Sequence, residues 1–91
     1  MPLIYGKHKV RDYDHWRPYF DNDQDRFHSV GAKTISVMRS TTDPNEVHFV
    51  FEAADLARFV GEMENPEVAK IMQDAGVLEK PTMYILQEPG H

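Results

Sequence analysis

The chain has 91 residues, no cysteine and a net charge of −5 at pH 7, which is enough for one domain and excludes disulfides and thiolate zinc sites. It has no run of Lys or Arg and no apolar stretch near the roughly 20 residues of a membrane span, which argues against nucleic acid and membranes as partners. Because the N-terminus lacks a signal-peptide pattern, we expect a cytoplasmic protein whose single domain covers residues 1–91.

The first predicted element is a strand over residues 3–10, where successive side chains alternate between two faces. One of these faces carries Ile4, Gly6, His8 and Val10. Residues 12–30 change to the helical period of about 3.6 residues, so we expect an amphipathic helix there. Its inward stripe consists of Tyr13, Trp16, Phe20, Phe27 and Val30. Because Pro18 is tolerated only in a first turn, regular helix is expected to begin near residues 15–18.

The second half of the sequence predicts two strands, a helical region and a last strand. Strands are expected at residues 32–40 and 47–53, joined by the turn sequence "TTDPNE". Asp55 is expected to cap the following helix. Asn65 is expected to cap a second stretch of helix that begins at Pro66. Residues 81–88 alternate again and predict the last strand.

This order of elements predicts an α+β domain of the ferredoxin-like βαββαβ type, with a four-stranded antiparallel sheet and both helical regions on one face. The strands, however, carry apolar side chains on both faces. In the third strand, Val47, Phe49 and Phe51 oppose His48 and Val50. A monomer would therefore expose one apolar face of the sheet, so we expect a homodimer that packs sheet against sheet.

Three segments resemble small proteins of the dimeric α+β-barrel superfamily: "HKVRDYDHWRPYFD", "DPNEVHFVFE" and "NPEVAKIMQDAGVLEKPTMYILQE". The most similar type is the antibiotic-biosynthesis-monooxygenase-like and cyclase-like group, and the resemblance covers nearly the whole chain. It implies a dimeric α+β barrel with a ligand cavity between each sheet and its helices. The superfamily includes cofactor-free oxygenases of aromatic substrates, polyketide cyclases and haem-handling enzymes. Haem-degrading relatives place an axial His on the second helix, and residues 55–75 contain none.

The segment "DNDQDRF" places Asp21, Asp23 and Asp25 at alternate positions, as in the first half of an EF-hand calcium loop. Such a loop needs Gly at its sixth position and Glu at its twelfth, where this chain has Arg26 and Ala32. We therefore expect no calcium site. A helical wheel instead directs Asp21 and Asp25 to solvent and places Asp23 within the aromatic stripe.

An inward Asp23 has two interpretations. A buried, unpaired carboxylate is costly or holds a proton, and near a cavity it is a candidate general acid or base. Alternatively, Asp23 reaches the edge of the domain and pairs with Arg26 or Lys33, without a catalytic role.

His8 and His48 are the other acid/base candidates, because they lie on strands that are neighbours in this fold and a neutral imidazole is a natural proton shuttle near pH 7. Each could reach the ligand cavity or the dimer interface, or serve only as a hydrogen-bonded structural residue. A cluster of His8, His48 and Asp23 would form an acid/base set or a 2-His-1-carboxylate iron site. Nothing in the spacing demonstrates a metal, so we expect none. The other histidines are expected at the surface or the terminus: His15, His28 and His91.

Aromatic residues are the candidates for a ligand pocket. Core packing explains most of them, but some could line a cavity that accepts a flat aromatic molecule. We expect this role for Trp16, Phe20, Phe51 and Tyr84. The phenol of Tyr84 could also orient a substrate oxygen.

The leading hypothesis is a small, cofactor-independent, monooxygenase-like enzyme that abstracts a proton from an aromatic or polyketide-like molecule. The alternatives are a polyketide-type cyclase of the same fold and a non-catalytic binding or scaffold dimer. An enzyme of this kind should have a cavity of about 300 Å³ or more with converging polar groups. A filled interior with Asp23 tied to a surface cation would argue against catalysis.

Overall fold

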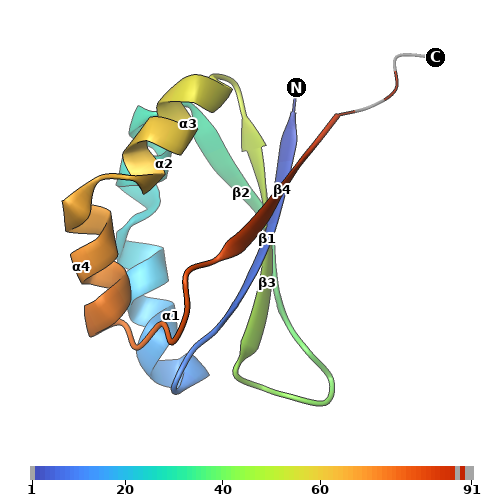
Figure 1. Cartoon of the computed structure of the whole chain (residues 1–91). Coiled ribbons are helices and arrows are strands. Elements are labelled where there is room, and N and C mark those ends of the chain that lie inside the picture. The colour runs from blue at the N-terminus through green and yellow to red at the C-terminus, as the bar shows by residue number, and fades with distance from the viewer. Residues whose placement is uncertain (1, 88, 90–91) are drawn as a thin grey trace.

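The computed structural model of the chain describes residues 2–87 and residue 89, so the expectation for His91 lies outside the described residues. Within them, four strands form one antiparallel sheet in the order β2-β3-β1-β4, and the helices all pack on one face of it (Figure 1). In chain order the elements are β1 (Leu3–Lys9), α1 (Tyr13–Asn22), α2 (Gln24–Ser29), β2 (Ala32–Arg39), β3 (Glu46–Ala53), α3 (Leu56–Met63), α4 (Pro66–Asp74) and β4 (Thr82–Leu86). This is the ferredoxin-like arrangement predicted from the sequence.

The first helical region differs from the single helix expected over residues 12–30. It begins at Tyr13, because the carboxylate of Asp12 accepts a hydrogen bond of 3.1 Å from the backbone N–H two residues later and caps the first turn. Pro18 lies inside α1, where it removes one backbone donor without ending the helix. The break comes at Asp23 instead, whose N–H bonds to the carbonyl three residues earlier before α2 begins.

The second helical region follows the predicted caps. The carboxylate of Asp55 accepts a hydrogen bond of 3.1 Å from the N–H of Arg58 and starts α3. The amide oxygen of Asn65 accepts one of 2.9 Å from the N–H of Glu67 and starts α4, with Pro66 as its first residue. No helix in the described part of the chain is long and apolar enough to cross a membrane.

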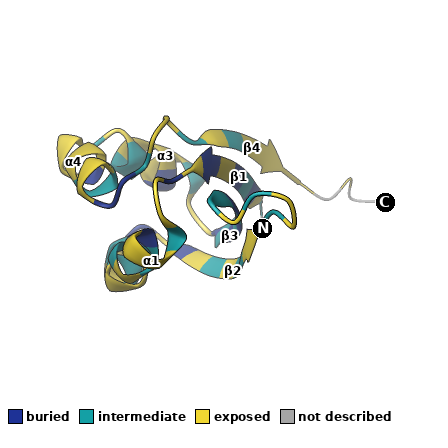
Figure 2. Ribbon diagram, turned by 90° about the horizontal axis from the view of Figure 1, so that it is seen from below, coloured by how far each residue is buried: buried dark blue, intermediate teal, exposed yellow. Residues whose placement is uncertain are grey.

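The core lies between the helices and one face of the sheet, where alternate strand residues meet the apolar stripes of the helices (Figure 2). Its central side chains are less than 5% exposed: Ile4, Val10, Trp16, Val47, Phe49, Phe51, Phe59 and Val68. Aromatic rings dominate this layer. Phe51, for example, lies 4.9 Å from Phe27 and 5.5 Å from Phe59, measured between ring centroids.

No helix covers the opposite face of the sheet in the described structure (Figure 1). Strand register brings Leu3 opposite Leu86 and Tyr5 opposite Tyr84 on this face. Leu3 is 36% exposed and Leu86 50% exposed. We call this surface the open face of the sheet.

Candidate functional site

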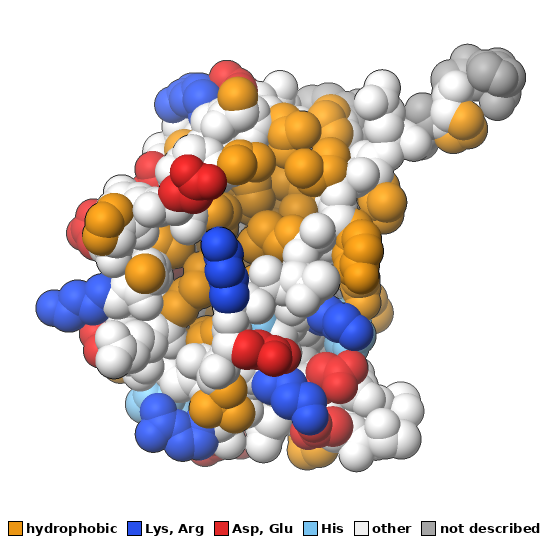
Figure 3. Space-filling model, viewed as in Figure 1, with side chains coloured by type: hydrophobic (Ala, Val, Ile, Leu, Met, Phe, Trp, Pro, Cys, Tyr) orange, Lys and Arg blue, Asp and Glu red, His pale blue; other side chains and the backbone are white. Residues whose placement is uncertain are grey.

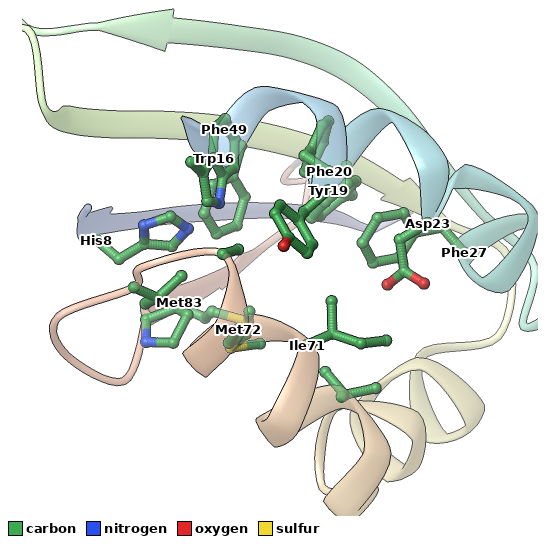
Figure 4. Close-up of a pocket in the computed structure, with 15 residues that line it drawn as sticks. His8, Trp16, Tyr19, Phe20, Asp23, Phe27, Phe49, Ile71, Met72 and Met83 are labelled. Atoms are coloured by element: carbon green, nitrogen blue, oxygen red, sulfur yellow. The ribbon is translucent and has the colours of Figure 1, made fainter. Parts of the chain in front are cut away.

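A half-open cavity of about 60 Å³ lies between the helices and the sheet (Figure 4). Its lining comes from β1, β3 and β4 on the sheet side and from α1, α2 and α4 on the helix side. Hydrophobic side chains also gather on the surface between α4 and β4 (Figure 3). The cavity is thus suited to an apolar molecule, and its few polar groups decide what chemistry it could support.

His8 is the main polar group at the sheet side of this cavity. Its imidazole is 6% exposed and lies between Trp16, at 5.5 Å, and Phe49, at 5.4 Å between ring centroids. Its Nδ1 is buried and has no hydrogen-bond partner among the described residues. Burial disfavours the charged form and lowers the pKa of His8 from 6.5 to about 4, although its own backbone offsets part of this effect. His8 is therefore neutral at pH 7 and has one nitrogen free to bond a ligand.

Asp23 lines the cavity at the end opposite His8 (Figure 4). The break between α1 and α2 places it there, with a side chain 18% exposed. Its Oδ1 accepts a hydrogen bond of 3.0 Å from Nε of Arg26. The same guanidinium contacts the carboxylates of Glu62, on α3, and Glu67, on α4. Asp23 is thus paired, as one of the two interpretations expected, and it does not form a cluster with His8.

His48 does not belong to this cavity, which corrects the predicted cluster of His8, His48 and Asp23. It follows Val47 on β3, and because neighbouring strand residues face opposite ways, its ring lies on the open face of the sheet. There its Nδ1 is hydrogen-bonded to the hydroxyl of Tyr5, and its Nε2 lies 2.8 Å from Oε1 of Glu46. These three side chains form a hydrogen-bonded chain that is separate from the cavity.

Tyr84 also lies outside the cavity, contrary to its predicted role in binding a substrate. It is 51% exposed on the open face, where its ring stacks 6.0 Å from that of Tyr5. Strand alternation explains the difference, because the preceding residue, Met83, points to the helix side and lines the cavity instead.

Trp16, Phe20 and Phe51, the other predicted ligand-binding residues, do line the cavity. The prediction missed several aliphatic residues that complete its walls. They include Ile71 and Met72 from α4. The helical stripe of α4 could have identified them, since it faces the sheet across from the aromatic stripe of α1.

The polar groups of the cavity do not form a metal site. Among the described residues, no group of three or more His, Asp or Glu side chains is arranged to hold a metal ion. The chemistry that the cavity itself can support is hydrogen bonding and proton transfer at His8, within a largely apolar and aromatic lining.

No model of a known protein family matches the sequence, and no curated protein matches it significantly. Solved structures do match the fold. A Bordetella bronchiseptica protein, provisionally described as an antibiotic biosynthesis monooxygenase, has a TM-score of 0.74 at 12% identity, over 96% of this chain and 95% of that chain. SnoaB, a cofactor-independent oxygenase from Streptomyces nogalater, has a TM-score of 0.70 at 11% identity, over 99% of this chain and 94% of that one. A NIPSNAP domain protein from Burkholderia xenovorans has a TM-score of 0.64 at 10% identity, over 99% of this chain and 96% of that chain.

These likenesses show that the chain has the α+β fold of antibiotic-biosynthesis-monooxygenase-like proteins, as the sequence resemblance implied. At 10–12% identity they show the fold alone and carry no residue roles. The NIPSNAP domain protein shares the same fold under a different description. What this chain does must therefore be argued from its own cavity.

Proposed function

We propose that the chain is a cofactor-independent enzyme of the monooxygenase type, which acts by acid/base chemistry on an aromatic or polyketide-like small molecule. The observation that carries this proposal is the buried Nδ1 of His8, which has no protein partner among the described residues and belongs to a side chain that lines a cavity rich in aromatic rings. Buried polar atoms are nearly always hydrogen-bonded, so an atom left free beside a cavity is suited to a ligand. The fold shared with a cofactor-independent oxygenase supports the same reading.

In the proposed reaction, a phenol or enol of the ligand donates its O–H to Nδ1 of His8. Burial keeps the imidazole neutral beforehand, and the oxyanion formed beside it then stabilises the imidazolium. The ligand carbanion reacts with molecular oxygen, which is the oxidant. Overall, the O–H of a phenol and one ring C–H react with one O2 to give the two carbonyl groups of a quinone and one water. In the keto form of the ligand the same step converts a CH2 group to a carbonyl group, so atoms and electrons balance.

The cavity must widen to admit such a ligand, because about 60 Å³ is well below the roughly 300 Å³ of small-molecule pockets. Helix α4 forms its outer wall, buries Val68 in the core and makes two polar contacts with α1 and α2. Nε2 of His15, on α1, lies 3.1 Å from the carbonyl oxygen of Asp74, and Arg26 lies 3.6 Å from Glu67. Each of these polar contacts includes one exposed group, so we expect that they break at modest cost when ligand binding moves α4 outward.

Two other functions are alternatives to this proposal. Proton abstraction without oxygen would lead to ring closure, as in a polyketide-type cyclase. A non-catalytic binding or scaffold role is favoured by two observations: the small cavity, and the pairing of Asp23 with Arg26.

Oxygen uptake distinguishes these functions. We expect the protein to consume oxygen with one or more members of a panel of polycyclic phenols, in the presence of a metal chelator and without added flavin. His8→Asn should lower turnover at least roughly 100-fold, the usual contribution of a general base. His28→Asn is the matched control, because His28 is exposed on α2, outside the cavity. Product formation without oxygen uptake would indicate a cyclase, and binding without turnover would indicate a binding protein.

Asp23→Asn tests whether the carboxylate that lines the cavity takes part in the reaction. Because Asp23 is paired with Arg26 at the far end of the cavity, we expect the variant to keep turnover within roughly tenfold of the wild type. Loss of turnover comparable to that of His8→Asn, in a variant that remains folded, would instead assign Asp23 a catalytic role.

A further inference from the structure

Beneath one ring that lines the cavity, the sheet has a residue without a side chain. Gly6 lies in the middle of β1, opposite Phe49 on β3 and Met83 on β4, and both of these neighbours line the cavity. A glycine in a strand interior weakens the strand and often marks a place where another group approaches closely. Here the approaching group is the ring of Phe49.

The ring of Phe49 occupies the space that a side chain at position 6 would fill. A Cβ atom built on Gly6 would lie within 3.0 Å of both Cε2 and Cζ of that ring, closer than such atoms pack in real proteins. Phe49 therefore leans across β1 and lies against the sheet only because Gly6 has no side chain.

Phe49 has little room to move sideways. Its ring is 4% exposed and has neighbours on both sides, with ring centroids 5.4 Å away at His8 and 5.2 Å away at Phe51. The ring already lies against the backbone of Gly6, so it cannot move further toward the sheet. The remaining direction is toward the cavity, so a methyl group at position 6 would push the ring into it.

We propose that Gly6 is a specificity-determining residue, which sets the depth of the cavity and thereby the size of the flat aromatic molecule that fits beside His8. The inference rests on the proposed function, because it assumes that this cavity is the ligand site. It adds a molecular feature that limits the ligand: the Phe49 ring, seated on Gly6, forms the floor on which an aromatic ligand would stack. The hydroxyl of that ligand would bond to His8.

The test measures binding rather than turnover, with phenol and 1-naphthol as one-ring and two-ring probes. Calorimetry gives the affinity, and the fluorescence of Trp16, the one tryptophan of the chain, reports occupancy of the cavity that it lines. Gly6→Ala should weaken 1-naphthol binding at least roughly tenfold, and phenol binding much less, because the raised ring removes space needed by the larger probe.

A second substitution keeps the test independent of folding. Gly6→Ala combined with Phe49→Leu replaces the ring by a smaller side chain and should restore 1-naphthol binding to within roughly threefold of the wild type, as expected for two residues in contact. Gly61→Ala is the matched control, because a Cβ at Gly61 meets no atom within 4 Å, and this variant should bind both probes as the wild type does. Thermal unfolding shows that each variant is folded.

The outcomes separate this inference from the proposed function. Selective loss of 1-naphthol binding in Gly6→Ala, with rescue by Phe49→Leu, supports the inference even if no variant consumes oxygen. Unchanged 1-naphthol binding in Gly6→Ala overturns it, as does loss that Phe49→Leu does not rescue. A wild-type protein that binds neither probe also overturns it, whatever its turnover of other molecules.

Discussion

Among the described residues, His8 is the one polar residue that is buried, and its environment determines how it responds to pH. Strand alternation in the sequence already placed it on the same face as Ile4 and Val10, and the structure confirms that position. The free Nδ1 could not be predicted in the same way. It depends on what surrounds the ring, namely Trp16 and Phe49, which offer π-faces and edges but no strong hydrogen-bond partner for Nδ1.

Residue-level titration gives the first prediction. Because burial lowers the pKa of His8 to about 4, the imidazole resonances of this residue should titrate with a midpoint near 4, well below the 6.5 of a free histidine. An NMR titration of the five histidines, assigned with His8→Leu, checks this value. If kcat/KM can be measured, its acid limb should fall near the same pH, since protonated His8 cannot accept a proton. A His8 midpoint near 6.5 would contradict the buried, unpartnered environment.

The same difference in pKa makes folding stability depend on pH. Since the folded pKa of His8 lies below the unfolded value of 6.5, the unfolded chain binds this proton more tightly. The contribution of neutral His8 to the free energy of unfolding is therefore fully present above pH 6.5 and is lost as the pH falls through 4. Between pH 7.5 and 4.5 this residue should account for a loss of roughly 2–3 kcal/mol in the free energy of unfolding. In urea denaturation, the free energy of unfolding of His8→Leu should fall less over this pH range than that of the wild type, by this amount. An identical pH dependence in the two proteins would disprove the lowered pKa of His8.

At the scale of elements, Arg26 joins three helices. Its guanidinium contacts Asp23 before α2, Glu62 on α3 and Glu67 on α4, and its own side chain is 20% exposed. These carboxylates hold the pKa of Arg26 above its ordinary value, with the hydrogen bond to Glu62 as the largest cause. Removal of the guanidinium would leave the carboxylates of Asp23 and Glu62 partly buried without their shared cation.

We therefore predict that Arg26→Met lowers the free energy of unfolding by about 2 kcal/mol, between the values typical of exposed and buried ion pairs. Arg17→Met is the matched control, because it removes the same charge from the neighbouring helix. Arg17 is 40% exposed and pairs with Asp21, which is 54% exposed, so its loss should cost less than about 1 kcal/mol. Equal effects of the two substitutions in urea denaturation would show that Arg26 does not join the helices in solution.

Most elements could be predicted because each has a local signal, and the errors arose where that signal was incomplete. Asp55 and Asn65 mark helix starts through their side-chain caps, and both are confirmed. The stripe over residues 12–30 continues across Asp23, so periodicity alone did not reveal the break there. The error at Tyr84 has a different cause: its phenol suggests a role at the cavity, whereas strand alternation places it on the face opposite Met83.

At the scale of the whole molecule, the main feature is a sheet face that exposes several apolar residues and has no covering layer in the described structure. Met38, on β2, is 52% exposed, and Leu86, on β4, is 50% exposed, so the exposed apolar residues extend across the sheet. Between them, the chain of Tyr5, His48 and Glu46 satisfies its polar groups internally. Such a face can be buried without leaving these polar groups unpaired, which suits an interface.

We therefore propose that two copies pack through their open faces and predict a dimer in solution. Sedimentation at micromolar concentration should give a species of twice the 10.6 kDa chain mass. Leu86→Lys places a charge on this face and should weaken the dimer at least roughly tenfold, because a buried, unpaired charge costs several kcal/mol.

Val60→Lys is the control for that substitution. Val60 is also an exposed apolar residue, at 41%, but it lies on α3, on the other side of the molecule, so the same change of charge there should leave the dimer intact. The comparison separates an effect on the interface from a general effect of charge or solubility. A wild-type species that sediments at the mass of one chain would show that the open face has another partner or none. Dissociation by both variants would show that the dimer does not form through the sheet.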